Sequence, residues 1–230
     1  MKWIVMLGMS RPAYFKQVLD SIAACPEHKD YYILISLDGG YDKRCRMLAE
    51  EFAVDRKVQI IPNIIRFGIN KHNLNALSMA CYFGATELVY VEDDTVLSPD
   101  ALEMSNHFFA NNYPAVCLNF FNGYSRIGTP ESKNLVYIQT FCPWGFAIKA
   151  EDFVTKFKPN WNSNSLGWDF SLCDYVTNNN SHVMIPELSR SHNIGREQGF
   201  HMSSDLYDSF FANCAHSTVS KPEQPWVVVA

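Results

Sequence analysis

A buried strand and an acidic cluster meet in Glu87-Leu88-Val89-Tyr90-Val91-Glu92-Asp93-Asp94. Residues 88–91 form a short continuous apolar run, which is typical of a strand buried on both faces of a parallel sheet. Three adjacent carboxylates at its end repel one another, and a divalent cation is the simplest group that relieves the repulsion. The same acids could instead cap the turn before a helix that starts at Ser98-Pro99-Asp100. The stretch therefore predicts a cation site at a strand end, with a turn cap as the alternative.

Strand-like and helix-like segments alternate on both sides of this stretch. Before it, strands are expected at residues 4–8, 31–37 and 58–61, and helices at 42–52, at 70–83 and from a capping Ser10 to the residue before Pro26. After it, strands are expected at 116–120, 136–140 and 182–185, and short helices at 151–156 and 168–176. This alternation predicts an α/β domain with a mainly parallel central sheet.

Composition narrows the class of protein. The 230 residues, 47% of them apolar, suffice for one domain with a substantial core. A formal net charge of −5 without any basic run argues against binding to nucleic acid. Seven dispersed cysteines without a C-x-x-C pair indicate reduced thiols, and the apolar run near the N-terminus is too short for a signal sequence or a membrane span. We therefore expect a cytoplasmic chain with no integral membrane segment.

Further motifs follow one another over most of the chain. In order they are Ser10-Arg11-Pro12, Ile35-Ser36-Leu37-Asp38-Gly39, Lys71-His72-Asn73-Leu74-Asn75-Ala76-Leu77, Val91-Glu92-Asp93-Asp94, Cys142-Pro143-Trp144-Gly145-Phe146, Gly167-Trp168-Asp169, and Pro186-Glu187-Leu188-Ser189-Arg190-Ser191 with Gly195-Arg196 and Gly199. This ordered series resembles the GT-A glycosyltransferases, and within them the inverting N-acetylglucosaminyltransferase I-like group.

The resemblance implies a fold and an activity. The fold is the Rossmann-like GT-A sandwich of three α/β/α layers. Residues 1–219 are then a single catalytic domain, with a nucleotide-sugar-binding half at 1–115 and an acceptor-binding half at 116–219. Residues 220–230 have the composition of a tail or linker, so the chain could be part of a longer one. The implied activity is inverting, metal-dependent transfer of a hexose or N-acetylhexosamine from a UDP-sugar to a hydroxyl of a glycan acceptor.

The resemblance also assigns roles at the donor. Arg11 and Asp38 are expected at the nucleotide, with Asp38 near the uracil or the ribose. Asp94 is expected to bind Mn²⁺ or Mg²⁺ directly, while Glu92 and Asp93 contact the sugar, the ribose or metal-bound water. The ion stabilises negative charge on the departing UDP.

The remaining assignments concern one helix, the base and a loop. His72 lies on the helix that matches the donor side of the family, although a lone histidine is more often a structural hydrogen-bonding group. Asp169 is expected to be the general base for the acceptor hydroxyl, with a helix N-cap as the alternative role and Asp174 as a weaker candidate.

The polar loop at residues 189–200 resembles the family segment that closes over the donor. Its Arg190 and Arg196 suit a diphosphate, because a guanidinium fork matches paired oxygens. His192 and His201 could contact the metal or the diphosphate, although a structural role is the more common one for such residues.

Other functions stay open at this point. The same fold could use another UDP-hexose or UDP-deoxyhexose, such as glucose, galactose or rhamnose, or could retain the anomeric configuration. A nucleotidyltransferase usually has a Gly-rich, basic loop after its first strand, whereas this chain has Gly8-Met9-Ser10-Arg11 there. A carbohydrate-binding domain is the alternative without catalysis, and it would not need an acidic triplet at a strand end.

Overall fold

The computed structural model describes residues 1–162, 167–197, 203–211, 213–218 and 224–229. The first half contains β1 (Lys2–Gly8), α1 (Pro12–Ala24), η1 (Pro26–Asp30), β2 (Tyr32–Leu37), α2 (Lys43–Phe52), β3 (Val58–Pro62), α3 (Ile69–Tyr82), β4 (Glu87–Val91), β5 (Thr95–Leu97) and α4 (Ala101–Ala110). The second half contains β6 (Cys117–Asn119), β7 (Asn134–Ile138), β8 (Phe146–Lys149), α5 (Ala150–Asp152), the π-helical turn η2 (Phe153–Phe157), α6 (Lys158–Asn160), α7 (Trp168–Asn178), β9 (Val183–Pro186), β10 (Ser191–Asn193), α8 (Ser204–Phe211) and β11 (Val227–Val228).

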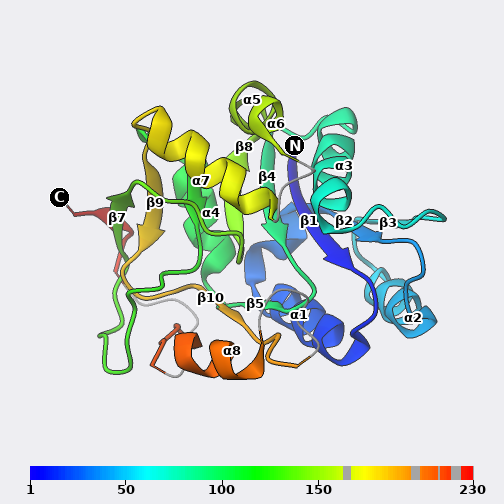
Figure 1. The fold of residues 1–230 in the computed structure, drawn as a ribbon. Helices are drawn as coiled ribbons and strands as arrows, with labels where there is room; N and C mark the ends of the chain where they lie inside the picture. Colours follow the sequence, from blue (N-terminus) through cyan, green and yellow to red (C-terminus); the bar gives the residue numbers. More distant parts are fainter. Residues whose placement is uncertain (163–166, 198–202, 212, 219–223, 230) are drawn as a thin grey trace.

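One central sheet runs through both halves of the chain (Figure 1). Its described strands are in the order β11-β7-β9-β6-β8-β4-β1-β2-β3. Of the neighbouring pairs, five are parallel and three are antiparallel. The predicted α/β class with a mainly parallel sheet is therefore confirmed.

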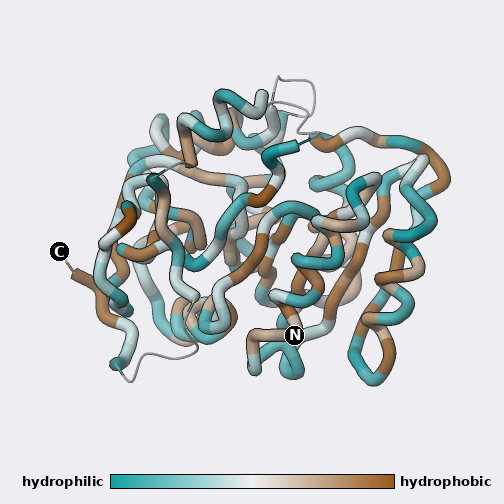
Figure 2. Tube along the Cα trace, turned by 90° about the horizontal axis from the view of Figure 1, so that it is seen from below, coloured by the Kyte–Doolittle hydropathy of each residue, from teal (hydrophilic) through white to brown (hydrophobic). Residues whose placement is uncertain are grey.

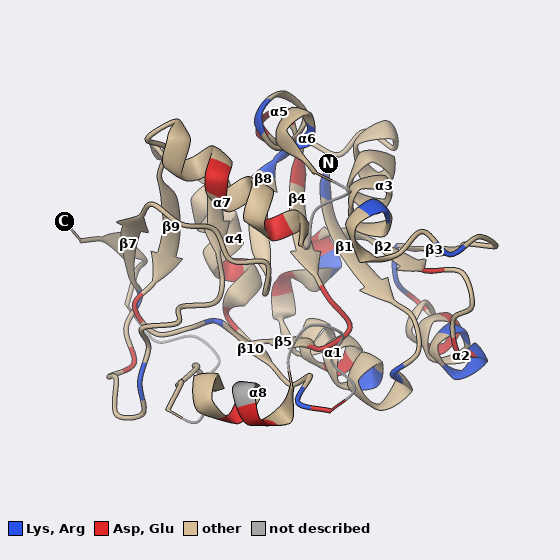
Figure 3. Cartoon of the chain, viewed as in Figure 1, with Lys and Arg blue, Asp and Glu red and all other residues tan. Residues whose placement is uncertain are grey.

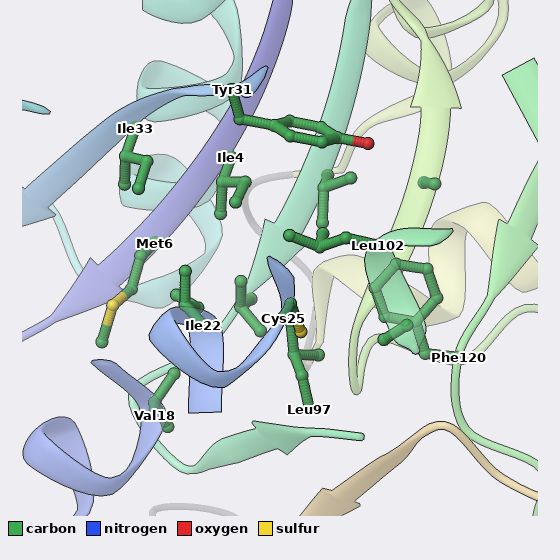
Figure 4. Packing of buried hydrophobic residues seen from close by; sticks show 14 of the residues in the cluster. Ile4, Met6, Val18, Ile22, Cys25, Tyr31, Ile33, Leu97, Leu102 and Phe120 are labelled. Atoms are coloured by element: carbon green, nitrogen blue, oxygen red, sulfur yellow. The ribbon is translucent and has the colours of Figure 1, made fainter. Parts of the chain in front are cut away.

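Helices cover the sheet on both faces because successive strand residues point to opposite sides. Ile4 and Met6 of β1 belong to a cluster with the apolar faces of α1, α2 and α4, and Figure 4 shows them opposite Val18 and Ile22 of α1. Val5 belongs to a second cluster, with α3, η2 and α7. Figure 2 shows hydrophobic (brown) and hydrophilic (teal) residues interleaved along the trace. The result is the expected three-layer arrangement.

The antiparallel strand β8 joins the two halves. It lies between β4 and β6, with Leu88 opposite Ile148 on one side and Leu118 opposite Ala147 on the other. The sequence prediction did not include β8, since four residues after a Trp-Gly turn carry too little pattern. Both halves also share one hydrophobic cluster, which contains Ile4 as well as Leu118.

Several boundaries differ from the predictions. Helix α1 has Arg11, not Ser10, at its N-cap position, without a side-chain cap. The helix expected at 151–156 is the succession α5, η2 and α6, which includes a π-helical turn. In the segment expected to be a tail or linker, Val227–Val228 pairs with β7 as an edge strand and Trp226 is only 6% exposed. The described part of that segment therefore belongs to the sheet.

None of the helices in the described part of the chain is both long and apolar enough to cross a membrane.

Candidate active site

A cavity of about 420 Å³ opens where β1, β2 and β4 end. Its described lining consists of Leu7, Gly8, Met9, Ser10, Arg11, Asp38, Arg66, Gly68, Ile69, His72, Glu92, Asp93, Asp94, Trp144, Asn193, Gly195 and Tyr207. Parallel strands direct their carboxyl ends to the same edge, which is where open α/β sheets bind ligands. Six of the residues predicted to bind donor or metal line this cavity: Arg11, Asp38, His72, Glu92, Asp93 and Asp94.

The acidic cluster is paired with Arg11. Its Nη1 lies 2.8 Å from Oδ2 of Asp94, and its Nη2 donates a hydrogen bond to Oδ1 of Asp93. Both carboxylates are 7% exposed, so this ion pair is largely shielded from water. The sequence argument names a divalent cation as the simplest relief of the repulsion among these acids. The structure shows that Arg11 already supplies one positive charge.

Burial and mutual repulsion shift the protonation of the cluster. Burial raises the pKa of Glu92 to about 8, and it raises the pKa of Asp93 to about 6 against the opposing effect of Arg11. It likewise raises the pKa of Asp94. Burial alone would lower the pKa of Arg11, but the charges of Asp93 and Asp94 raise it overall. Because an opposite charge nearby favours the ionised form, a cation bound at this wall would lower the raised carboxyl pKa values.

The acids do not cap a helix, because β5 follows them and α4 begins only at Ala101. In Figure 3 the red segment that follows β4 leads into the centre of the molecule, below the strand ends. Among the described residues, no three His, Cys, Asp or Glu side chains converge as a metal site. Asp93 and Asp94 nevertheless offer the carboxylate oxygens that Mn²⁺ and Mg²⁺ accept from a protein when phosphate and water supply the other ligands. The donor set thus fits an ion shared with a diphosphate.

Asp38 organises the loop that borders the cavity. Its Oδ1 accepts hydrogen bonds from the backbone N–H groups of Gly39 and Phe67, at 2.9 and 2.8 Å, and its Oδ2 accepts one from Gly68 at 2.9 Å. The carboxylate is 3% exposed. Asp38 therefore both lines the cavity and fixes the backbone of residues 66–68.

His72 is held in the cavity wall by a neighbouring hydroxyl. Its Nε2 lies 2.8 Å from Oγ of Ser36, which also accepts a hydrogen bond from Nδ2 of Asn63 at 3.2 Å. Burial lowers the pKa of His72, although the charge of Asp38 opposes the shift. A neutral imidazole suits a hydrogen-bonding role in this wall.

A small two-stranded sheet brings the polar loop over the acids. Strand β10 pairs antiparallel with β5, so that Asn193 lies opposite Thr95. Nδ2 of Asn193 then donates a hydrogen bond to Oδ1 of Asp94 at 3.2 Å. A Cβ atom at Gly195 would lie 2.3 Å from Oδ2 of Asp94, so any larger residue would force this carboxylate or the loop to shift.

Several cavity residues were not predicted from sequence. Arg66, Trp144, Asn193 and Tyr207 line the cavity, and the hydroxyl of Tyr207 donates to the backbone carbonyl of Asn193. Arg66 could have been predicted from its position after the strand expected at residues 58–61, because ligands bind where such strands end. Trp144 and Asn193 lie in segments that the sequence did single out, the motif at residues 142–146 and the loop at 189–200, but neither was assigned a role at the donor. Nothing in the sequence pointed to Tyr207, because α8 reaches the cavity only through tertiary packing.

Two predicted diphosphate ligands lie elsewhere. Arg190 is fully buried, pairs with Asp100 at 3.0 Å, and donates to the carbonyls of Leu188 and Ser132 at 2.7 and 2.6 Å. This placement in the core contradicts a role at the donor, because every part of its guanidinium has a structural partner. Arg196 is half-exposed and forms a two-pronged ion pair with Asp208 of α8 at 2.6 and 2.7 Å.

Asp169 lies in the first turn of α7 and is not among the described lining residues of the cavity. The turn is fixed by the backbone N–H of Trp168, which donates to Oδ1 of Asn70 at 3.1 Å. The N-cap position belongs to Gly167, so the predicted alternative of a capping Asp169 does not hold. Burial raises the pKa of the Cys142 thiol, and Asp169 and Glu92 both add to the shift, which places both carboxylates near that thiol. Asp174, one turn later, is exposed.

The structure describes only one of the two histidines expected near the metal or the diphosphate. His192 lies in β10 and stacks on His216 with ring centroids 4.6 Å apart, outside the described cavity lining. His201 and Gly199 lie outside the residues that the structure describes.

Comparison with known proteins supplies the fold family. Neither protein-family models nor curated proteins gave a match, whereas solved structures did. TarS of S. aureus, residues 1–349 with UDP-GlcNAc, superposes with a TM-score of 0.62 at 15% identity, over 87% of this chain and 60% of that one. The mannosyltransferase PcManGT from Pyrobaculum calidifontis, with GDP-Man and Mn²⁺, gives 0.58 at 12%, over 82% and 57%. GalNAc-T7 with UDP, GalNAc and Mn²⁺ gives 0.65 at 11%, over 92% and 47%.

The chain has the GT-A fold. It spans between 47% and 60% of the length of these three proteins. The GT-A fold expected from the motifs is thus confirmed, and membership of the N-acetylglucosaminyltransferase I-like group stays a prediction.

Proposed function

We propose that the chain is a metal-dependent glycosyltransferase that moves a hexose or N-acetylhexosamine from a UDP-sugar to a glycan hydroxyl. The observation that carries the proposal is the cavity at the strand ends, where Arg11, Asp38 and the cluster Glu92, Asp93 and Asp94 meet. The similar solved structures support it, since TarS was solved with UDP-GlcNAc and GalNAc-T7 with UDP, GalNAc and Mn²⁺.

Asp94 and Asp93 are the proposed protein ligands of Mn²⁺ or Mg²⁺. When bound, the ion supplies Lewis-acid stabilisation of the charge that develops on the leaving diphosphate. Asn193 orients Asp94 through its hydrogen bond. Glu92 is oriented by the hydroxyl of Tyr90, which donates to its Oε1 at 2.8 Å.

Arg11 is the proposed diphosphate partner beside the ion. Its guanidinium faces the cavity and holds two carboxylates in place, so it provides positive charge where phosphoryl oxygens would lie. Asp38 and His72 form the wall on the side of β2 and α3, the proposed position of the nucleoside.

Asp169 is the proposed general base of an inverting reaction. It would remove the proton of the acceptor hydroxyl as that oxygen attacks the anomeric carbon. Trp168, 3% exposed and stacked on Trp161 with ring centroids 4.6 Å apart, makes the turn that carries Asp169 rigid. A retaining reaction would not need this base.

The test is a thermal-shift panel of UDP-sugars and GDP-sugars, each with and without Mn²⁺. A ligand that binds only the native state raises the melting temperature, by an amount that grows with the logarithm of its concentration divided by its Kd. We expect UDP-sugars to stabilise the protein in the presence of Mn²⁺ and GDP-sugars to have little effect. Absence of any nucleotide-sugar stabilisation would refute the proposal and leave a metal-independent glycan binder as the alternative.

Two substitutions separate binding from chemistry. Asp94→Ala should abolish the Mn²⁺-dependent shift, because it removes the principal ligand of the ion. Asp169→Asn should leave the shift intact and slow transfer by roughly 100-fold, the usual scale for loss of a general base. The exposed Asp174→Asn, on the same helix, is the control and should transfer at the wild-type rate. Normal turnover by Asp169→Asn would remove Asp169 from this role.

A further inference from the structure

Apolar side chains project from the connection between β3 and α3. Ile64 is 97% exposed, Ile65 is 67% exposed, and Phe67 and Ile69 follow at 37% and 40%. Single exposed apolar residues are ordinary on protein surfaces, but four among six consecutive positions are not. Figure 1 shows this connection, residues 63–68, extending beyond the edge of the sheet next to β3.

The backbone of this β3–α3 loop is fixed from the protein side. Asp38 accepts the N–H groups of Phe67 and Gly68, and Asn63 donates from its backbone N–H to the carbonyl of Leu37 at 2.9 Å. A Cβ atom at Gly39 would lie 2.2 Å from the carbonyl carbon of Ile65, which shows how closely the two backbones pack. Both ends of the loop are therefore held by hydrogen bonds to β2 and Asp38, while the two isoleucine side chains between them are exposed.

Positive charge accompanies the apolar residues. Arg66 lies within the loop, and Lys71 is exposed in the first turn of α3. Between Asp55 and Glu87 the sequence has no acidic residue, although the whole chain carries a net charge of −5. Figure 3 shows blue on the connection between β3 and α3, whereas α2 carries both blue and red residues and α8 carries red.

We infer that the β3–α3 loop docks on the surface of an anionic phospholipid bilayer. Isoleucine and phenylalanine side chains enter the boundary between headgroups and acyl chains, and flanking cations interact with lipid phosphates, the combination that holds peripheral segments at an interface. Arg66, Gly68 and Ile69 also line the cavity. Docking would therefore bring the mouth of the cavity to the bilayer, where an acceptor carried by a lipid can reach it.

The test is flotation of the full chain with vesicles of phosphatidylcholine alone or mixed with phosphatidylglycerol. We expect the wild type to float with the anionic vesicles and to be released by high salt. Ile64→Ser combined with Ile65→Ser should abolish flotation, and Lys71→Glu should weaken it about tenfold. The matched control is Tyr124→Ser with Ile127→Ser, which removes two side chains that are 77% and 73% exposed on a different loop.

The outcomes distinguish this inference from the proposed enzyme function. Loss of flotation in the Ile64/Ile65 variant, with a normal nucleotide-sugar thermal shift, supports the membrane surface. Equal flotation of that variant and the control overturns it. Failure of the wild type to float also overturns it. If light scattering shows that the wild type is a dimer and that Ile64→Ser with Ile65→Ser makes it a monomer, the surface binds a second copy instead, which likewise overturns the inference. None of these results affects the thermal-shift test.

Discussion

Arg11 is the residue on which the electrostatics of the cavity depend. Its guanidinium forms ion pairs with both Asp93 and Asp94, and its side chain is only 17% exposed. Removal of one partner from a buried ion pair leaves uncompensated charge and is strongly destabilising. An added divalent ion can restore part of the lost stability if the same carboxylates bind it.

Arg11→Met should accordingly lower the free energy of unfolding by about 3 kcal/mol. Mn²⁺ should then raise the melting temperature of the variant more than that of the wild type, because the ion no longer competes with the guanidinium. Calorimetric melting with and without Mn²⁺ checks both effects. An equal response of the two proteins would show that Asp93 and Asp94 do not hold the ion.

Gly195 lets the loop approach the acidic cluster. Gly195→Ala should displace either Asp94 or residues 193–195, because a Cβ atom would also come within 3.1 Å of Nη1 of Arg11. We expect the apparent affinity for the nucleotide sugar, measured by thermal shift, to fall by at least about tenfold, which corresponds to roughly 1.4 kcal/mol. Gly123→Ala is the control, since its Cβ would meet its nearest atom at 3.4 Å, an ordinary contact. Similar binding by both variants would contradict the packing argument.

The strand pattern placed the acidic residues of the cavity, whereas charge type alone did not separate Arg11, which lines the cavity, from Arg190, which is buried in the core. Asp38 and the 92–94 cluster follow apolar strands directly, so the strand pattern alone places them at one edge of the sheet. Arg190 has the same local features as a phosphate ligand, but its partner Asp100 lies 90 positions away in the chain. Charge type does not reveal whether a guanidinium faces a ligand or a buried carboxylate.

Among the elements, strands β5 and β10 pair with each other and hold the polar loop in place. His192 stacks there on His216, and burial lowers the pKa of both, to about 4 for His192. Proximity to His216 adds to the shift of His192, while Glu131 opposes the shift of His216. Strands of three residues leave no periodic signal, which is why neither β5 nor β10 was predicted.

This histidine pair should make stability depend on pH. Each folded-state pKa is below that of the unfolded chain, so the unfolded state binds more protons between about pH 6.5 and pH 4, and stability falls as the pH decreases through that range. Between pH 7 and pH 5 the wild type should lose free energy of unfolding. We expect His192→Gln to reduce this loss by about 1 kcal/mol, a value discounted for partial exposure. Urea unfolding at both pH values measures it, with His182→Gln as the control. An unchanged slope for His192→Gln would contradict the assignment.

At the scale of the whole molecule, the two predicted halves share one central sheet and one hydrophobic cluster. The strand pattern indicated the parallel half correctly, because each of its strands is a buried apolar run next to a periodic helix. The antiparallel half depends on short strands whose partners are distant in sequence, such as β6 with β8 and β7 with β9. Residues 224–229 show most clearly where prediction from sequence fails, because a segment with the composition of a linker leads directly into an edge strand.

Trp226 shows why that last segment matters to the whole fold. Its ring covers two buried cations, with Cζ of Arg190 at 5.2 Å and Nζ of Lys133 at 5.4 Å from the ring centroid. Lys133 in turn pairs with Glu103 of α4 at 3.0 Å, and Arg190 pairs with Asp100 at the start of the same helix. The indole therefore shields from water an ion-pair network that connects the strand edge to α4.

Trp226→Ala should lower the free energy of unfolding by about 3 kcal/mol, both through the cavity left in the core and through hydration of the two cations. For a chain of this size the melting temperature should fall by roughly 6–12 °C. Nucleotide-sugar binding should persist below the new melting temperature, because the cavity is lined by other elements. Val227→Ala, at a position 46% exposed on the edge strand, should change the melting temperature little. If Trp226→Ala melted like the wild type, the segment would be a detachable tail, as its composition suggests, and the network beneath it would be stable without cover.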